Sequence, residues 1–208
     1  MSRQIAYLLL DAAKPLDPAA VIAALRQRHP DQPVEPMTGS AATGQAAEAM
    51  MLRCAGVALV VMVMAPLVAN AMAMPLPEEE WKLPALRASS QWPDALSVFS
   101  GHKAHMVVST LSEPSDRLPS ARSIAALVGA LIAVLPGCRA VLWDTLVAHS
   151  AQTWEAVSRD AFAPYPVFPY PLMGWSGRAP APPANEAGEG AAKTRSTPCP
   201  RNSIAKSP

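Results

Sequence analysis

The sequence predicts an α+β fold in which helices pack on a mixed β-sheet of about five to six strands. Three observations lead to this class. Short apolar runs that end at a charge or a proline recur along the chain, segments with a helical spacing of apolar residues lie between them, and their order requires both hairpin and crossover connections. The 208 residues suffice for one core, so we expect a single domain over residues 1–175 and a tail over residues 176–208.

The N-terminal part predicts one strand and one helix. Residues 5–11, IAYLLLD, form a short apolar run that ends at a charge and predict a buried strand. Asp17 followed by Pro18 is typical of a helix start, because the aspartate accepts a hydrogen bond from a free N–H of the first turn. That helix should end before the next proline. Residues 31–47 are rich in Pro, Gly, Ser, Thr and Ala and predict a loop, with at most one short strand near Val34.

The segment over residues 54–77 contains no charge and allows two interpretations. A membrane-spanning helix needs about 20 apolar residues, and this segment is interrupted at Asn70 before it reaches that length. The β-branched residues of 58–64 and the alternating pattern after Pro66 favour two adjoining strands instead. A helix over residues 54–74 that anchors the chain in a membrane is the alternative.

After the uncharged segment we expect two short helices and a strand. Residues 78–80 are three glutamates in what the pattern indicates is a first helical turn, where the helix dipole stabilises negative charge. Pro84 and Pro93 should divide this region, which leaves a second helix over residues 94–100. Residues 106–112, MVVSTLS, then predict a strand.

The clearest helical pattern in the chain covers residues 120–135, where large apolar residues lie three and four positions apart and Pro136 follows directly. Residues 138–143 predict another short strand. Ser150 is expected to cap the helix that comes next. An edge strand over residues 171–175 would complete the sheet.

The composition changes at Ser176. Six of the 33 residues from this point to the end are proline, and Ile204 is their one large apolar side chain. Such a segment buries too little apolar surface to offset the entropy lost on ordering, so we expect a disordered tail.

Charge and cysteine usage argue against several classes of partner. A net charge of +1 gives no surplus for neutralising phosphates, so we expect no nucleic-acid partner. Cys54, Cys138 and Cys199 lie far apart, which is typical of reduced thiols in a cytoplasmic protein rather than of disulfides or a zinc site. The N-terminus lacks the pattern of a signal peptide, which also favours the cytoplasm.

His102 and His105 are the first candidates for a chemical role, because histidines three positions apart can share a metal on a helix. Here a strand is predicted to follow, and an extended backbone would direct the two side chains to opposite faces. We therefore expect His105 to be a partly buried residue at a strand entrance and His102 to lie in solvent, with no metal site.

Asp144 and His149 form the second pair of candidates. Asp144 ends a predicted strand and His149 precedes a predicted helix, so both could meet at one edge of the sheet as a general acid–base couple. An aspartate at the end of a strand is also typical of a turn. No Ser or Cys nucleophile stands in a G-x-S-x-G elbow, which argues against catalysis through this pair. The glycine-rich residues 39–44 lead into Gln45 rather than lysine, so the phosphate-loop pattern fails and we expect no bound cofactor.

The middle of the chain resembles a bacterial family. The segments PLPEEEW, WPDALSVFSGHKAHMVVSTLS and CRAVLWDTLVAHSAQTW, with an apolar helix before the last, occur in an order similar to that of the domain of unknown function 4261. The resemblance covers about residues 4–175 and is closest over residues 75–157. It implies a bacterial intracellular protein of unassigned activity and transfers no catalytic residue. The chain departs from the family pattern after Trp175, where a further apolar strand would be expected.

Three hypotheses for the function follow. The first, which we favour, is a non-enzymatic accessory domain in the cytoplasm that binds another protein. The second is a small hydrolase or transferase that uses His105, Asp144 and His149, which would have to lie within hydrogen-bond reach around one cleft. The third is an inner-membrane protein anchored by residues 54–74, with Arg53 on the cytoplasmic side.

Overall fold

The computed structural model describes residues 4–37, 49–64, 75–111 and 117–164. All of them belong to one compact unit, which spans residues 1–178. The expected disordered tail over residues 176–208, the edge strand over residues 171–175 and the second strand predicted after Pro66 lie outside the described residues.

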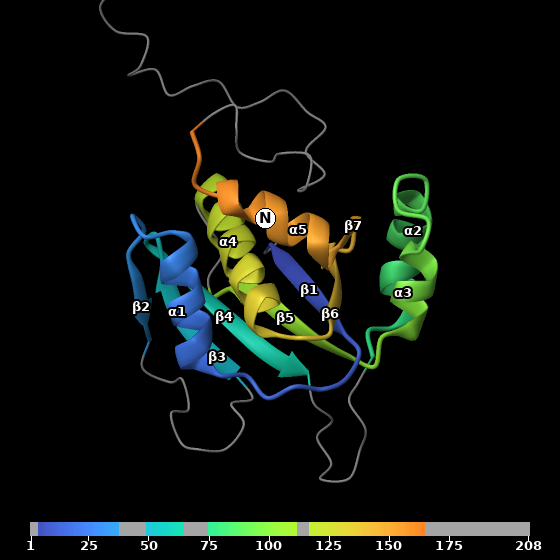
Figure 1. Cartoon of the computed structure of the whole chain (residues 1–208), viewed down its shortest axis with the longest axis horizontal. Helices are drawn as coiled ribbons and strands as arrows, with labels where there is room; N and C mark the ends of the chain where they lie inside the picture. The colour runs from blue at the N-terminus through green and yellow to red at the C-terminus, as the bar shows by residue number, and fades with distance from the viewer. Residues whose placement is uncertain (1–3, 38–48, 65–74, 112–116, 165–208) are drawn as a thin grey trace, which may run out of the picture. The chain divides into compact units, whose positions relative to one another are not determined.

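Seven strands form one sheet in the order β2-β3-β4-β5-β1-β6-β7, and each neighbouring pair is antiparallel (Figure 1). The strands are β1 (Ile5–Leu10), β2 (Val34–Pro36), β3 (Ala49–Cys54), β4 (Val57–Met64), β5 (Ala104–Thr110), β6 (Cys138–Trp143) and β7 (Val147–Ser150).

The predicted α+β class is confirmed, and the sheet differs from the expectation in two details. Over the described residues it has seven strands rather than five or six, because β3 and β7 were not predicted. Its pairings are antiparallel rather than mixed. Strands β5 and β6 do run in the same direction, as their helical connection requires, but β1 lies between them, so they are not neighbours.

The helices cover both faces of the sheet. Helices α1 (Pro18–Arg28), α4 (Arg117–Val134) and α5 (Ala151–Val157) pack on one face, and the 3-10 helix η1 (Ser158–Asp160) continues α5. Helices α2 (Glu78–Ala88) and α3 (Ala95–Gly101) pack on the other face, over β6 and β7 (Figure 1). The sheet is therefore the middle layer of three.

The alternation of side chains along β1 divides the core between these two layers. Leu8 and Leu10 point toward α1 and α4, while Leu9 points toward α2 and α3, and all three are buried. This explains why the sequence of β1 is apolar without interruption, since a strand that is covered on both faces has no solvent side.

Helix α4 supplies most of the first core and confirms the predicted helix over residues 120–135, although it begins three residues earlier, at Arg117. Its middle is buried on every side, between the sheet, α1 and α5. Among the described residues it is the one helix with the length and hydropathy to cross a membrane, and 61% of it is buried inside the fold.

The structure resolves the ambiguity of the uncharged segment for residues 57–64. These residues form β4, which pairs with β3 on one side and β5 on the other. A membrane helix over residues 54–74 is therefore contradicted in its first half. Strand β3 was missed because its AMMLRC sequence contains a charge and follows directly on a segment with loop composition.

Pro84 does not divide its region as predicted, because α2 runs through it from Glu78 to Ala88. Pro84 lies beside Trp81 on the buried face of the helix. The apolar contact of the ring with the core compensates for the hydrogen bond that proline cannot donate, so packing overrides local propensity here. The break predicted at Pro93 is present, since α2 and α3 are separate helices.

We expect that Asp17→Ala will lower the free energy of unfolding by about 1 kcal/mol. The Asp17 carboxylate accepts hydrogen bonds from the backbone N–H groups of Ala19 and Ala20, at 3.0 and 3.2 Å, and alanine leaves both donors without this acceptor. Urea denaturation measures the change. Asp17→Asn, which keeps an acceptor, and Asp31→Ala in the exposed turn after α1 should remain close to the wild type; equal losses in all three variants would contradict the capping role.

Candidate functional site

His105 and His149 lie on opposite faces of the sheet. His105 is a buried residue of β5 that shares a face with Tyr7, and the two ring centroids are 6.1 Å apart. His149 in β7 lies beside Trp154 of α5, with ring centroids 5.7 Å apart. The sheet therefore separates the two imidazoles, and they cannot act on the same substrate atom from one cleft.

Asp144 lies at a third position, in the turn between β6 and β7. Its Oδ1 accepts a hydrogen bond of 2.7 Å from the backbone N–H of Ile5, and its own N–H donates to the Ile5 carbonyl at 2.8 Å. Arg117 Nη2 lies 3.8 Å from Oδ2. Burial raises the pKa of Asp144, and the Ile5 hydrogen bond and the Arg117 charge oppose this shift. The carboxylate thus ties the start of β1 to the end of β6.

The unpredicted strand β7 is the reason why Asp144 and His149 do not meet. The residues between them make a tight turn, and β7 then runs back along β6 so that His149 pairs with Val141. The prediction of an acid–base couple required His149 to lead directly into a helix at the edge of the sheet. The geometric condition of the hydrolase hypothesis is not met for His105, Asp144 and His149.

His102 is buried rather than in solvent, which corrects the expectation from the sequence. Its Nε2 accepts a hydrogen bond of 2.7 Å from the backbone N–H of Leu76, and its Nδ1 contacts the carbonyl oxygen of Phe99. Both ring nitrogens are thus engaged in joining α3 to the segment before α2. Within the described residues, no group of three or more metal-binding side chains comes together.

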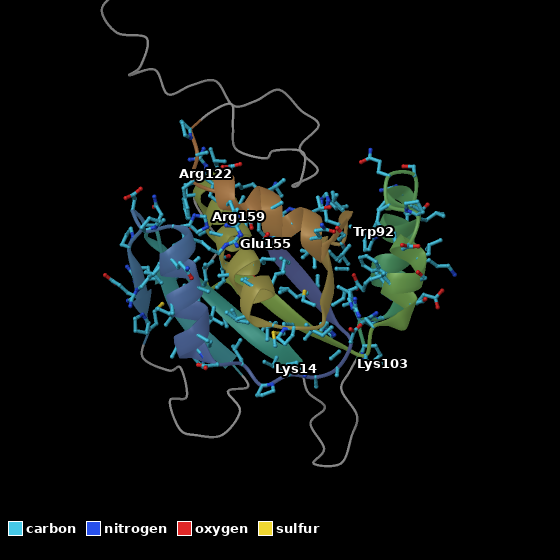
Figure 2. All side chains as sticks on the ribbon, in the orientation of Figure 1. Lys14, Trp92, Lys103, Arg122, Glu155 and Arg159 are labelled. Carbon is cyan, nitrogen blue, oxygen red and sulfur yellow. The ribbon has the colours of Figure 1, made fainter. Side chains whose placement is uncertain are left out.

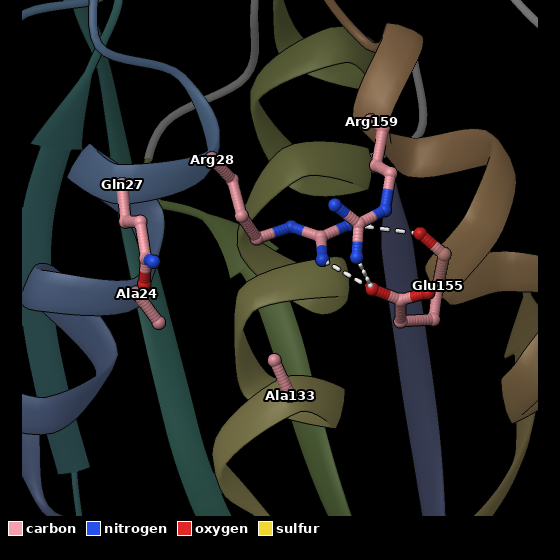
Figure 3. A pocket seen from close by; sticks show the side chains of 6 residues that line it. All are labelled: Ala24, Gln27, Arg28, Ala133, Glu155 and Arg159. Carbon is pink, nitrogen blue, oxygen red and sulfur yellow. Dashed lines mark hydrogen bonds and ion pairs between the residues drawn. The ribbon is translucent and has the colours of Figure 1, made fainter.

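A groove of about 330 Å³ lies between α1, α4 and α5, where sequence analysis predicted no site (Figure 3). Its lining residues are Ala24, Gln27, Arg28, Ala133, Glu155 and Arg159. Figure 2 shows Glu155 and Arg159 over α4 and α5, away from Trp92, which lies on the side of α2 and α3. The groove is hence on the face of the sheet that α2 and α3 do not cover.

Arg28 connects the ends of two helices across this groove. Its Nη1 donates to Oε1 of Glu155 at 2.5 Å, and its Nη2 donates to the Glu155 carbonyl and to Ser158 Oγ, both at 2.8 Å. Arg159 Nη2 reaches the same Glu155 Oε1 at 2.6 Å. These hydrogen bonds, chiefly the one from Arg28, hold the pKa of Glu155 below its usual range.

Gly129 allows this arrangement because α4 passes very close to η1. A β-carbon at this position would lie 2.0 Å from Ser158 Oγ and 3.0 Å from Arg28 Nη2. The first distance is impossible for non-bonded atoms and the second is tighter than most real contacts, so a larger residue would displace Ser158, a partner of Arg28. The i,i+4 spacing of Glu155 and Arg159 is visible in the sequence, but the pairing with Arg28 joins residues 127 positions apart and has no local signal.

The second candidate surface is the outer face of α2. Leu83 and Leu86 are 53% and 54% exposed, although Trp81, Pro84 and Ala85 on the opposite side are buried. Residues three positions apart are neighbours on a helix, so the two leucines form one apolar area, which we call the leucine surface.

Comparisons of the chain with protein-family models, with curated proteins and with solved structures found no match. The resemblance to the domain of unknown function 4261 therefore stays a prediction.

We expect Asp144→Ala to lower the free energy of unfolding by about 1–3 kcal/mol, because the partly buried Ile5 N–H loses its acceptor. The φ angle of 48° adds to this cost, since alanine adopts it less readily than Asp or Asn. Asp144→Asn keeps an acceptor and should be close to the wild type near pH 7. Urea denaturation of the three proteins measures both effects.

The pH dependence distinguishes Asp144→Asn from the wild type. Because the pKa of Asp144 is raised in the folded chain, the stabilisation linked to its protonation is complete below the usual aspartate pKa and is lost as the pH rises through the folded value. Wild-type stability relative to Asp144→Asn should therefore be greatest in acid and smallest at neutral pH. The opposite slope would contradict the assignment.

Gly129→Ala should destabilise the fold by about 1–3 kcal/mol through overpacking against Ser158. Ser158→Gly removes both side-chain atoms that the new methyl group would meet, so the double variant should lose less than the sum of the two single losses. Denaturation of all four proteins gives this coupling. Strictly additive losses would show that the close approach of α4 and η1 is not the cause.

Proposed function

We propose that the chain is a cytoplasmic accessory domain that binds another protein through the leucine surface of α2. The observation that carries this proposal is the exposure of Leu83 and Leu86 on a helix whose opposite side already packs on the sheet. A helix that only covers a sheet needs one apolar stripe, and α2 has a second one.

The size of these side chains supports a role in binding. Burying a leucine that is now about half exposed contributes on the order of 1 kcal/mol, and neighbouring leucines form a continuous contact that excludes water. Helix α3, which packs against α2, exposes a third leucine, Leu96, by 37%. Apolar side chains of this size gather on protein surfaces where a partner covers them.

The charges at the start of α2 indicate the chemistry of the partner. Glu78, Glu79 and Glu80 occupy the first turn, and Lys82 forms an exposed ion pair with Glu78 at 2.6 Å. Lys82 pairs with Glu78, so it does not neutralise the carboxylates of Glu79 and Glu80, which precede the leucines on the same helix. A partner with an apolar centre and a basic rim would complement both features.

The double substitution Leu83→Ser and Leu86→Ser tests this proposal. In-cell cross-linking of the tagged full chain identifies a partner, which is then purified and titrated against the chain by calorimetry. We expect at least a tenfold weaker affinity for the double variant, because two apolar contacts are lost. Its melting temperature should stay near that of the wild type, since both leucines are exposed.

Met62→Ser is the matched control, because Met62 is a 37% exposed apolar residue of β4 and not part of α2. It should bind the partner as the wild type does. If the double variant retains full affinity, or if Met62→Ser loses as much affinity as the double variant, the leucine surface is not the binding site.

A further inference from the structure

The groove between α1, α4 and α5 carries more positive charge than its own carboxylate balances. Arg28 and Arg159 both donate to Oε1 of Glu155, so two guanidinium groups share one negative charge. The lowered pKa of Glu155 keeps this carboxylate ionised at neutral pH, and the lining residues then carry a net charge of +1. The residues that carry this charge take no part in the leucine surface.

Arg28 also has an unmet demand for a hydrogen-bond acceptor. Its side chain is only 6% exposed, and its Nε has no hydrogen-bond partner in the part of the chain that the structure describes. A buried donor on a charged group is costly when it lacks an acceptor. Additional negative charge in the groove would stabilise this guanidinium even without direct contact with Nε.

Arg159 is the guanidinium that can reach a ligand. Its side chain is 62% exposed, and its ion pair with Glu155 is an i,i+4 contact within one short segment. Exposed pairs of this kind contribute little to stability, so a change of partner costs little. Gln27 lies on α1 at the other wall of the groove, on the far side of Arg28 (Figure 3).

The floor of the groove is apolar. Ala24 of α1 and Ala133 of α4 line it, and Figure 3 shows Arg28 crossing from α1 toward Glu155 above Ala133. Methyl groups at this position favour an aliphatic body over a fully hydrated ion. The volume of about 330 Å³ suits a molecule of a few carbon atoms.

The ends of the helices select among anions. Arg28 is the last residue of α1, Ala133 lies in the last turn of α4, and Glu155 lies near the end of α5. Each helix C-terminus carries partial negative charge. These partial charges oppose any anion and oppose a dianion more strongly, so a singly charged carboxylate fits the groove better than a dianionic phosphate does.

We propose that this groove binds a small organic acid, whose single carboxylate pairs with Arg159 while its aliphatic body lies on the alanine floor. The carboxylate replaces Glu155 as the partner of Arg159 and can accept two parallel hydrogen bonds from its guanidinium. Arg28 and Glu155 remain paired and keep α1 and α5 in place.

Titration of the ¹⁵N-labelled full chain with sodium butyrate at constant ionic strength tests this proposal. We expect saturable shifts of the backbone amides of the six lining residues in the millimolar range. Butanol should give no saturation because it lacks the charge, and neither should sodium phosphate at a pH above its second pKa, where it is a dianion. Linear shifts with butyrate, or saturation by phosphate or butanol at the same concentrations, would overturn the proposal.

Two variants locate the site. Arg159→Gln should weaken butyrate binding at least tenfold, whereas Arg139→Gln is the matched control, because Arg139 is 61% exposed and pairs with Asp11 at 2.7 Å on another part of the surface. Ala133→Leu fills the floor without altering any charge and should also abolish saturation. Binding of wild-type strength in Arg159→Gln or in Ala133→Leu would show that butyrate does not occupy the groove.

Discussion

The insertion of β1 between β5 and β6 is the constraint on which the rest of the structure depends. Residues near the N-terminus pair with strands that lie about a hundred residues or more further along the chain, and both ends of β1 are fixed by residues that flank β6. At one end Ile5 and Asp144 exchange hydrogen bonds, and at the other the N–H of Asp11 donates to the carbonyl of Gly137 at 3.0 Å. The sheet cannot be completed until α4 and β6 are present, and contacts of such long range are slow to form.

Placing β1 in the middle of the sheet also separates the two candidate surfaces. Its residues alternate between a core under α1, α4 and α5, where Trp143 and Trp154 stack with centroids 5.8 Å apart, and a smaller core under α2 and α3. The leucine surface belongs to the helices of the second core and the groove to those of the first. A protein partner on α2 would therefore leave the groove open, so both sites can be occupied in the same molecule.

Features with a local cause could be predicted from the sequence, and features with a distant cause could not. The capping residues Asp17 and Ser150 act within three positions of themselves, and both do so as expected. Strand β7, by contrast, has the sequence VAHS, which is a strand only because β6 offers its edge. Because β7 runs back along β6, His149 pairs with Val141 and lies away from Asp144. The partners of Arg28 depend on how α1 and α5 pack on α4, and no window of sequence contains that information.

The two arginines of the groove differ in what the fold requires of them. Arg28 is nearly buried and donates to both the carboxylate and the carbonyl of Glu155 near the end of α5. Its removal would take one donor from each of these acceptors and break the link between α1 and α5. Arg159 adds a second cation to a carboxylate that Arg28 already neutralises, and it is exposed. Stability therefore accounts for Arg28 and Glu155 but gives little reason for Arg159. A residue that the packing does not need, at the mouth of a groove with uncompensated positive charge, is the one whose substitution separates ligand binding from folding.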